Sequence, residues 1–237
     1  MWRSGQQRRV AIIERYVSLR DKRVLDLGCG VGEYVRAFEQ RGAEAFGCDI
    51  EWPRLLEARA RGTGDVLAAA GESLPFADDS IEVIVLNEVI EHVQNDQATM
   101  REVGRVLAPG GTCVIYAPNR LYPFETHGIY LGKRYVFGNI PFVNWLPGFL
   151  RDRLVPHARA YKTSDWPRVF AGSGLEVRAQ GVVYPGFDNL EARLGRLGRW
   201  IRAFCYWAEG TPLERFGLSH LIVLRKPEVE AEPQVAA

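Results

Sequence analysis

The sequence is poor in the residues that most often bind metals or form redox centres. It contains four cysteines and four histidines in 237 residues. The cysteines stand far apart, and no two of them have the C-x-x-C spacing of zinc-binding and redox motifs. We therefore predict no metal site and no redox-active disulfide. Scattered cysteines also suit a reducing compartment, so we expect a cytoplasmic protein.

The sequence also lacks an excess of charge of one sign, and it lacks long apolar runs. Lys and Arg together number 30 and Asp and Glu number 29, so no global charge would attract nucleic acid, and we expect no such partner. No apolar run is long enough to span a membrane. The apolar stretch at residues 10–13 is too short for a signal peptide. We expect a single domain over residues 1–226 and a disordered, Pro- and Glu-rich tail over residues 227–237.

Apolar runs alternate with helical patterns through the first half of the chain. Strands are predicted at residues 23–28, 43–49, 65–70, 81–87 and 112–118. Helices are predicted at residues 5–19, 31–42, 52–62 and 95–107, and a turn at residues 108–111. Strands that alternate with helices imply parallel crossovers, so we predict a doubly wound α/β sheet covered by helices on both faces.

The pattern changes after the fifth predicted strand. Residues 119–160 are rich in aromatic residues, proline and glycine and have no regular period, which is typical of a lid-like insertion with a function. Regular structure is predicted to resume with a helix at residues 163–172 and a strand at 175–184. A helix at residues 188–208 and a last strand at 219–226 follow.

The stretch DLGCGVGEY places Gly28, Gly30 and Gly32 between a predicted strand and a predicted helix. Ligands of open parallel sheets bind beyond such strand ends. Asp49, at the end of the next strand, could accept hydrogen bonds from ribose hydroxyls, or it could simply cap the following helix. Glu33 stands where a dinucleotide-binding loop has its third glycine, and a carboxylate at a helix N-terminus repels phosphate. The spacing therefore argues against a nicotinamide-dependent oxidoreductase.

DLGCGVGEY resembles the glycine-rich first motif of class I S-adenosylmethionine-dependent methyltransferases. The similarity continues with Asp49 in GCDIEW, with GESLPFADDSIEVIVLNEVIEHV and with VGRVLAPGGTCVIYAPN, and the last two stretches are similar to the type 11 subgroup. It covers about residues 20–120 and resumes at residues 157–177. The resemblance implies S-adenosyl-L-methionine as cofactor. It also implies a Rossmann-like fold, in which a seven-stranded and mostly parallel sheet has an antiparallel last strand.

The resemblance further implies which residues bind the cofactor. Asp26 and the glycine-rich backbone at residues 28–32 would flank its methionine part. Asp49 would bind the ribose hydroxyls, and Ile50 would pack on the adenine ring.

Two further segments complete the implied cofactor site. The backbone of Gly71 and Glu72 would face the adenine edge, and Asn87 and Glu88 would lie beneath the methionine and sulfonium end. Ala70 departs from the family, which commonly has an aspartate there to accept a hydrogen bond from the adenine amino group. Loss of one such bond costs about 1 kcal/mol, so we expect weaker binding unless another group, such as Glu72, replaces it.

Histidines near two strand ends are the candidate catalytic residues. His127 lies just after the fifth strand, and Glu125 could orient its ring and raise its basicity, as in a general base. The same pair could instead hold the loop together. His92, in NEVIEHV, is either catalytic or a hydrogen-bonding residue of its loop. A polar cluster at residues 157–162 could close over the substrate or anchor the insertion.

The aromatic insertion suggests an apolar cavity or a lipid-like acceptor, or else a lid with its own small core. In the helix predicted at residues 188–208, leucines share one face, tryptophans border it and arginines lie elsewhere. Such a helix resembles an interfacial membrane helix, which would give peripheral membrane contact, or it packs on the domain or on a second subunit.

These features together predict an enzyme that transfers methyl from S-adenosylmethionine to a small-molecule or lipid- or glycan-linked acceptor, at oxygen. The fourth strand ends in NEVIEH rather than in an N-P-P-Y-type motif, which argues against methylation of nucleic-acid base amino groups. The alternatives are a non-catalytic S-adenosylmethionine-binding protein and, less favoured, an NAD-dependent oxidoreductase.

Overall fold

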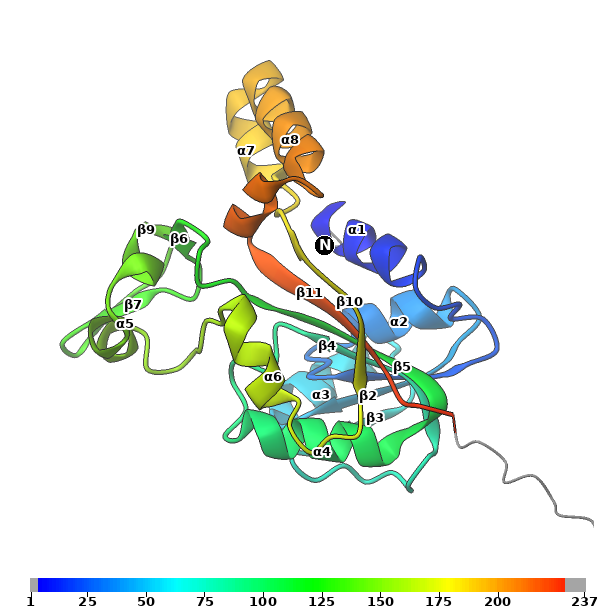
Figure 1. Cartoon of the computed structure of the whole chain (residues 1–237). Coiled ribbons are helices and arrows are strands. Elements are labelled where there is room, and N and C mark those ends of the chain that lie inside the picture. The colour runs from blue at the N-terminus through cyan, green and yellow to red at the C-terminus, as the bar shows by residue number, and fades with distance from the viewer. Residues whose placement is uncertain (1–3, 229–237) are drawn as a thin grey trace, which may run out of the picture.

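The computed structural model describes residues 4–228, so most of the tail predicted at residues 227–237 lies outside the described residues. The central sheet has the strand order β10-β11-β5-β4-β1-β2-β3 (Figure 1). Its strands are β1 (Arg23–Leu27), β2 (Glu44–Asp49), β3 (Val66–Ala68), β4 (Ile81–Asn87), β5 (Leu107–Pro118), β10 (Glu176–Val183) and β11 (Ser219–Arg225). Strands β1 to β5 pair in parallel, and β11 runs antiparallel to both of its neighbours. The predicted mostly parallel sheet with an antiparallel last strand is confirmed.

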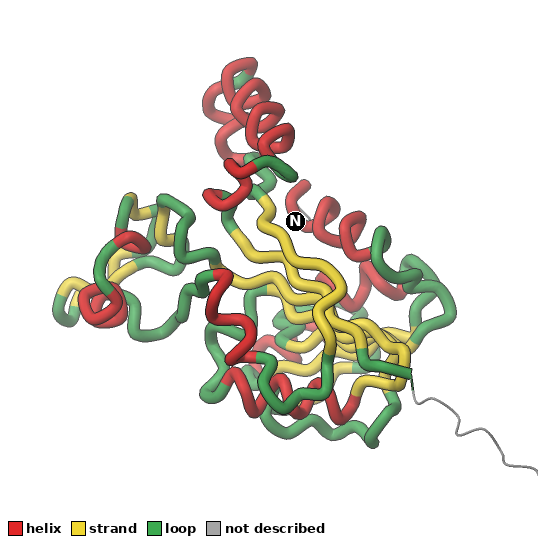
Figure 2. Tube along the Cα trace, in the orientation of Figure 1, coloured by secondary structure: helices red, strands yellow, loops and turns green. Residues whose placement is uncertain are grey.

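Helices cover both faces of this sheet (Figure 2). One face packs against α1 (Ser4–Ile13), α2 (Glu33–Glu39) and α3 (Trp52–Ala60), and the other against α4 (Asp96–Val106) and α6 (Trp166–Val169). Successive strand residues point to opposite faces. In β1, for example, Val24 joins the first core and Leu25 the second. The apolar runs of the strands therefore fill two cores, as a doubly wound sheet requires.

Several predicted element boundaries are wrong. The first helix ends at Ile13 rather than at residue 19, because tighter i to i+3 hydrogen bonds, from Arg15 to Ile12 and from Tyr16 to Ile13, are mixed among the bonds that follow. The predicted turn at residues 108–111 belongs to β5. The pairing register with β4 shifts there, so these residues of β5 are extra residues opposite β4. The helix predicted at residues 163–172 is a 3₁₀ turn (Thr163–Asp165) followed by the short α6.

The helix predicted at residues 188–208 is two helices, α7 (Asp188–Leu194) and α8 (Arg196–Ala208). Gly195 separates them with a φ of +52°, which a residue with a side chain rarely adopts. The helices pack closely, because a Cβ atom on Gly198 would lie 2.7 Å from the Cα of Glu191. The pair projects from the sheet at the top of Figure 1.

The insertion at residues 119–160 forms a small lobe instead of an irregular loop. It contains β6 (Phe124–Glu125), β7 (Ile129–Leu131), β8 (Arg134–Val136), β9 (Ile140–Pro141), a 3₁₀ turn (Val143–Trp145) and α5 (Gly148–Leu154). Ile129, Val143, Val155 and Ala158 form its own small core, and its action as a lid stays a prediction. We call this segment the aromatic lobe.

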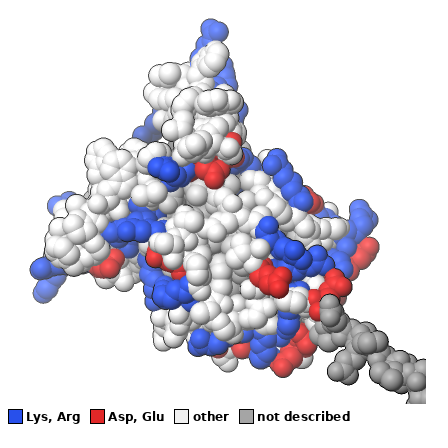
Figure 3. All heavy atoms as spheres, viewed as in Figure 1, with Lys and Arg blue, Asp and Glu red and all other residues white. Residues whose placement is uncertain are grey.

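The aromatic lobe and the α7–α8 pair arise from the same edge of the sheet. Val183, at the end of β10, pairs with Ser219, which pairs with Pro118, the residue after which the lobe begins. Much of the surface of both projections is uncharged in Figure 3, and Lys or Arg side chains lie at the tip of the upper one. Among the described residues, we find no helix with the length and apolarity needed to cross a membrane.

Candidate active site

The glycine-rich turn lies at the carboxyl end of β1, between that strand and α2. Gly28, Gly30 and Gly32 all have positive φ values, of 78°, 53° and 74°, which glycine adopts without steric cost. A Cβ atom would collide with Val89 at Gly28 and with Thr63 at Gly32. Gly30 is different, since a Cβ atom there would meet only an Arg54 nitrogen at 3.5 Å. Close approach by a ligand is therefore possible at Gly30.

Asp49 connects the glycine turn to the next loop. One carboxylate oxygen accepts a hydrogen bond of 2.7 Å from the Gly30 N–H, and the other accepts one of 2.8 Å from the Glu51 N–H. The second bond comes from Glu51, the N-cap residue of α3, and not from an N–H of the first helical turn, so the structure does not show the alternative in which Asp49 caps this helix. Each carboxylate oxygen has a further lone pair, which leaves Asp49 able to accept from ribose hydroxyls as well.

The residues expected around adenine lie in the neighbouring loops. The Ile50 side chain is exposed at 70%, although apolar, and so offers a free face for stacking. Gly71 is buried and packs on Thr99. The Glu72 carboxylate accepts a hydrogen bond from the Asn95 N–H at 2.9 Å. That bond commits one oxygen of Glu72 to the loop before α4, which limits its capacity to replace the aspartate missing at Ala70.

Asn87 and Glu88, at the end of β4, are held by an arginine that the sequence did not single out. Arg9 on α1 donates hydrogen bonds to the side chains of both, and also to Ser219 at 2.9 Å. Burial opposes ionisation of Glu88, but Arg9 and Ser219 outweigh it and lower the pKa of that carboxyl. Glu88 has a φ of +58°, a costly conformation for a non-glycine residue that is typical of functional sites. The sequence analysis did not identify Arg9 as a site residue. Its position in the amphipathic first helix was the only available signal, and that signal does not show which residues Arg9 contacts.

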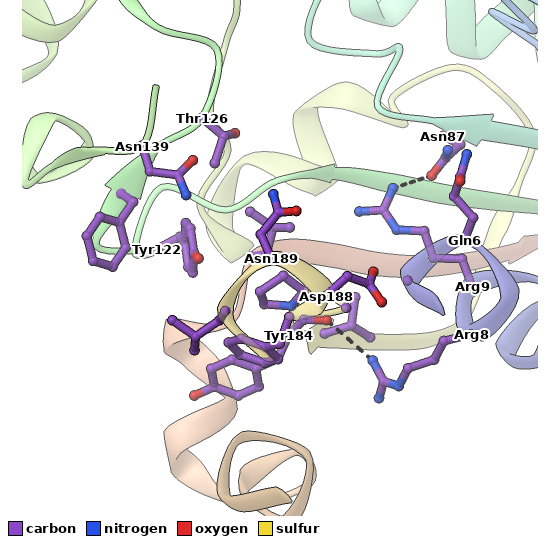
Figure 4. A pocket seen from close by; sticks show the side chains of 18 of the residues that line it. Gln6, Arg8, Arg9, Asn87, Tyr122, Thr126, Asn139, Tyr184, Asp188 and Asn189 are labelled. Carbon is purple, nitrogen blue, oxygen red and sulfur yellow. Dashed lines mark hydrogen bonds between the residues drawn. The ribbon is translucent and has the colours of Figure 1, made fainter. Parts of the chain in front are cut away.

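A pocket of about 560 Å³ opens beside Asn87. Figure 4 shows Arg9, Arg8 and Gln6 of α1 on one side, Tyr122, Thr126 and Asn139 of the aromatic lobe on the other, and Tyr184, Asp188 and Asn189 between them. Phe124 and Phe187 add aromatic surface. The pocket is therefore amphipathic, and it joins the end of β4 to both projections.

The predicted pair of His127 and Glu125 is found. His127 Nδ1 lies 2.9 Å from Glu125 Oε1, and Arg151 donates to the other oxygen of Glu125 at 3.0 Å. Nε2 of His127 lies 3.7 Å from Glu91 Oε1. Burial lowers the pKa of His127, but the two carboxylates outweigh it and raise that pKa. The ring therefore holds a proton near neutral pH and is a poor proton acceptor in this state.

His92 belongs to the same cluster. Its Nδ1 lies 2.9 Å from the carbonyl oxygen of His157, and its Nε2 lies 3.8 Å from Glu91 Oε1. The rings of His92 and His127 meet edge to face, with centroids 5.2 Å apart. His92 thus makes the loop-holding hydrogen bond that the sequence allowed, and it also faces the carboxylate of Glu91.

The polar segment at residues 157–162 anchors the aromatic lobe. Arg159 donates to the carbonyl oxygens of Val93 and Gln94 at 2.6 and 2.8 Å. Tyr161 is buried and donates to the carbonyl of Ile90 at 2.9 Å. These bonds tie the end of the lobe to the loop after β4, so the anchoring alternative agrees with the structure.

Comparison with known proteins supplies the family. The sequence profile of the family described as "Methyltransferase domain" matches residues 25–115. An uncharacterised methyltransferase of Mycobacterium sp. (strain JLS) is 38% identical over 212 residues, which cover 86% of this chain and 76% of the relative. A second, from Mycobacteroides abscessus, is 28% identical over 220 residues, covering 89% and 78% of the two chains.

Solved structures agree on the fold. A methyltransferase in complex with the Haloferax volcanii Trm112 methyltransferase activator superposes with a TM-score of 0.65 at 20% identity, covering 97% of this chain and 92% of that one. An S-adenosylmethionine-dependent methyltransferase from Mesorhizobium loti gives a TM-score of 0.62 at 19% identity, covering 91% and 96%. Both share the Rossmann-like sheet described above.

Proposed function

Because the chain belongs to the S-adenosylmethionine-dependent methyltransferases, we propose that it methylates a hydroxyl group of a small or lipid- or glycan-linked acceptor bound in the pocket beside Asn87. The observation that carries this proposal is the position of the pocket, which reaches Asn87 at one side and the aromatic lobe at the other. An acceptor seated there would meet the cofactor at the end of β4.

The cofactor, S-adenosylmethionine, fits the residues around the glycine turn. Gly30 has open space where a Cβ atom would be, and Asp49 retains acceptor capacity beside it. Ile50 presents an exposed apolar face that matches an adenine ring. We assign the methionine end to Asp26, Asn87 and the glycine backbone.

Aromatic residues of the pocket would bind the acceptor and exclude water. Tyr122 and Phe124 come from the aromatic lobe, and Tyr184 and Phe187 come from the start of the α7–α8 pair. Aromatic side chains bury large apolar areas, and Tyr keeps a polar end for a hydroxylated ligand. This lining favours an acceptor with an apolar part and a polar head.

The reaction requires positioning above all. The bound cofactor supplies a methyl carbon that passes from sulfur to the acceptor oxygen while the hydroxyl proton is released. Alignment in a closed pocket can lower such a barrier by roughly 7–11 kcal/mol. We assign the handling of the proton to the cluster of His127, Glu125 and His92, in which the His92 ring, whose pKa burial lowers, is the one able to accept it. The cluster lies beside the pocket, because Thr126 lines the pocket and directly precedes His127.

Peripheral membrane contact through the α7–α8 pair would give the enzyme access to a lipid-linked acceptor. Leu197, Trp200, Phe204 and Trp207 lie on one face of α8 and are all exposed, Trp200 at 74% and Trp207 at 66%. Arg193 and Arg196 are exposed near the tip of the pair. Tryptophans beside arginines on one helix suit an interface between water and anionic lipid.

A binding experiment followed by a labelling screen tests the proposed function. S-adenosylhomocysteine at 100 times its Kd should stabilise the protein by about 2.7 kcal/mol in thermal unfolding, and NAD should have no effect. Methyl-labelled cofactor incubated with hydroxylated lipids and glycolipids should then yield a methyl ether, identified by mass spectrometry. Label on an amine nitrogen, or on hydrophilic metabolites alone, would refute this acceptor class.

Two variants separate the two halves of the site. Phe124→Ala should raise KM for the acceptor at least tenfold and leave affinity for S-adenosylhomocysteine unchanged. Asp49→Asn should weaken the binding of S-adenosylhomocysteine, because a hydrogen bond from a ribose hydroxyl to a charged acceptor contributes about 1.5–3 kcal/mol. Equal effects of Phe124→Ala on both ligands would contradict the assignment of the pocket to the acceptor.

A further inference from the structure

Three side chains that can bind a metal converge after the carboxyl end of β4. Glu91 and His92 lie in the loop that follows this strand, and His127 reaches the same point from the aromatic lobe. One ligand atom of each lies within 4.8 Å of the others. The two imidazole Nε2 atoms face the same carboxylate oxygen, Glu91 Oε1, at 3.8 and 3.7 Å.

Glu91 is buried without a hydrogen-bonding partner for its carboxylate. The residue is 2% exposed, and neither oxygen accepts a hydrogen bond within the described residues 4–228. A buried carboxylate is costly unless a cation compensates it. The position therefore suits a cation, either the proton on His127 or a metal ion, at the point that the two histidines face.

Both histidines are oriented as metal-binding histidines usually are. His127 directs Nδ1 at the Glu125 carboxylate, and His92 directs Nδ1 at the carbonyl oxygen of His157, both at 2.9 Å. A carbonyl oxygen only accepts, so Nδ1 of His92 carries the hydrogen and Nε2 keeps a free lone pair. A ligand histidine typically donates its other nitrogen to a carboxylate or a backbone carbonyl in this way. Arg151 neutralises Glu125 from behind, in a buried ion pair of 3.0 Å.

We propose that Glu91, His92 and His127 bind one divalent transition-metal ion. Two imidazoles and one carboxylate form a donor set that suits ions such as Zn²⁺, Co²⁺ or Fe²⁺. Metal–nitrogen bonds of about 2.0–2.1 Å bring neighbouring ligand atoms to about 3–3.5 Å. The present separations from Glu91 require only a small contraction.

This site has a consequence for the reaction, and that consequence rests on the proposed function. Three protein ligands leave coordination positions open on the ion. An acceptor hydroxyl bound there would have a lowered pKa and lose its proton more readily. The ion thus gives His127 and His92 a role in catalysis that does not require a free imidazole base.

Titration of the full chain with Co²⁺ tests the site without acceptor or cofactor. The protein is first freed of metal with a chelator and then followed by visible absorption. We expect one ion per chain and visible bands that Zn²⁺ abolishes by competition. Glu91→Gln and His127→Gln should each weaken Co²⁺ binding at least 100-fold, and His92→Gln at least tenfold, since even outer-sphere changes cost 10–100-fold.

His157→Gln is the matched control. His157 contacts the same cluster, but it offers its backbone oxygen to His92, and its ring lies against the His127 carbonyl. This variant should bind Co²⁺ within threefold of the unmodified chain. Circular dichroism and S-adenosylhomocysteine binding establish that each variant is folded.

The outcomes separate this inference from the proposed function. No Co²⁺ bands at millimolar ion, or equal loss in Glu91→Gln and His157→Gln, would overturn the metal site and leave the methylation proposal standing. Tight Co²⁺ binding in a protein that methylates no hydroxyl would support the metal site and count against the proposed acceptor.

Discussion

At the scale of single residues, the carboxyl group of Asp26 shows how burial sets the chemistry of the cofactor site. Asp26 lies in β1 and is 2% exposed. Burial raises its pKa to about 8, and repulsion from Asp49 contributes. The protein thus holds a carboxyl group largely neutral until a positive charge arrives. The ammonium group of the methionine part of the cofactor would supply that charge.

A pH profile tests this interpretation. The folded chain keeps a proton on Asp26 up to about pH 8, whereas the unfolded chain releases it near its ordinary pKa of 3.8. The folded state therefore binds more protons in this window, and stability falls as the pH rises. Asp26→Asn should be the more stable form at pH 9, by about 1–3 kcal/mol, and nearly equal to the unmodified chain at pH 4, as measured by urea unfolding without cofactor.

The control for that experiment is Asp65→Asn, which removes an exposed carboxylate from the loop before β3. In this control, the free energy of unfolding should depend on pH as it does in the unmodified chain. If Asp26→Asn merely follows the same profile, the Asp26 carboxyl ionises as it does in water and the interpretation fails.

At the scale of elements, the aromatic lobe depends on one buried ion pair. Arg151 on α5 is 1% exposed and bonds to Glu125 of β6 and to the carbonyl of Ala158. The pair joins the first and last parts of the lobe, and it also fixes the carboxylate that orients His127. The lobe therefore positions the histidine cluster and does more than cover the pocket.

Removal of Arg151 should unfold or loosen the lobe. Arg151→Met leaves the buried Glu125 carboxylate with His127 as its remaining partner, and loss of one member of a buried ion pair costs about 3–5 kcal/mol. Arg153→Met changes an exposed arginine of the same helix and should cost less than about 0.5 kcal/mol. Hydrogen exchange should show lost protection in residues 124–158 for the first variant alone. Equal stability of the two variants in urea would disprove the role of the pair.

At the scale of the whole molecule, two projections rise from one edge of the sheet and flank the pocket. The lobe carries Phe137 and Phe149, and the α7–α8 pair carries Trp200 and Trp207, all strongly exposed. α1 links the pair to the sheet, because Arg8 bonds to Glu209 and stacks on Tyr206 with 4.1 Å to the ring centroid. A membrane surface that met the α8 face would lie close to the elements that form the pocket (Figures 1 and 3).

Vesicle co-sedimentation tests the membrane contact. The protein should sediment with vesicles of phosphatidylcholine and phosphatidylglycerol, and addition of salt should reduce binding. Trp200→Ala combined with Trp207→Ala should weaken binding at least tenfold, since a large apolar side chain contributes about 1.5–3 kcal/mol on burial. Trp52→Ala removes a similarly exposed tryptophan from α3 and should bind as before. If the double substitution leaves sedimentation with vesicles unchanged, membrane contact through α8 is refuted.

The parts that were predictable from sequence are those set by local pattern. Apolar runs that alternate with amphipathic segments determined the parallel sheet, and the glycines with Asp49 located the loops at its carboxyl edge. The order and spacing of these motifs also pointed to the family. The exact helix ends were not predictable, because Gly195 divides a continuous periodic pattern and only close packing at Gly198 shows that two helices result.

Contacts between distant parts of the chain were decided by the tertiary structure alone. Arg9 forms hydrogen bonds with Asn87 and Glu88, which lie nearly eighty residues further along the chain. No periodicity in the sequence predicts these bonds. Glu91 resembles a surface carboxylate in the sequence, yet the fold buries it against two histidines, one of which comes from a separate lobe. Backbone conformation and hydrophobic pattern act over a few residues, so sequence fixes elements and their order. Burial and charge pairing depend on what the folded chain brings alongside, so only the assembled molecule decides which groups share a site.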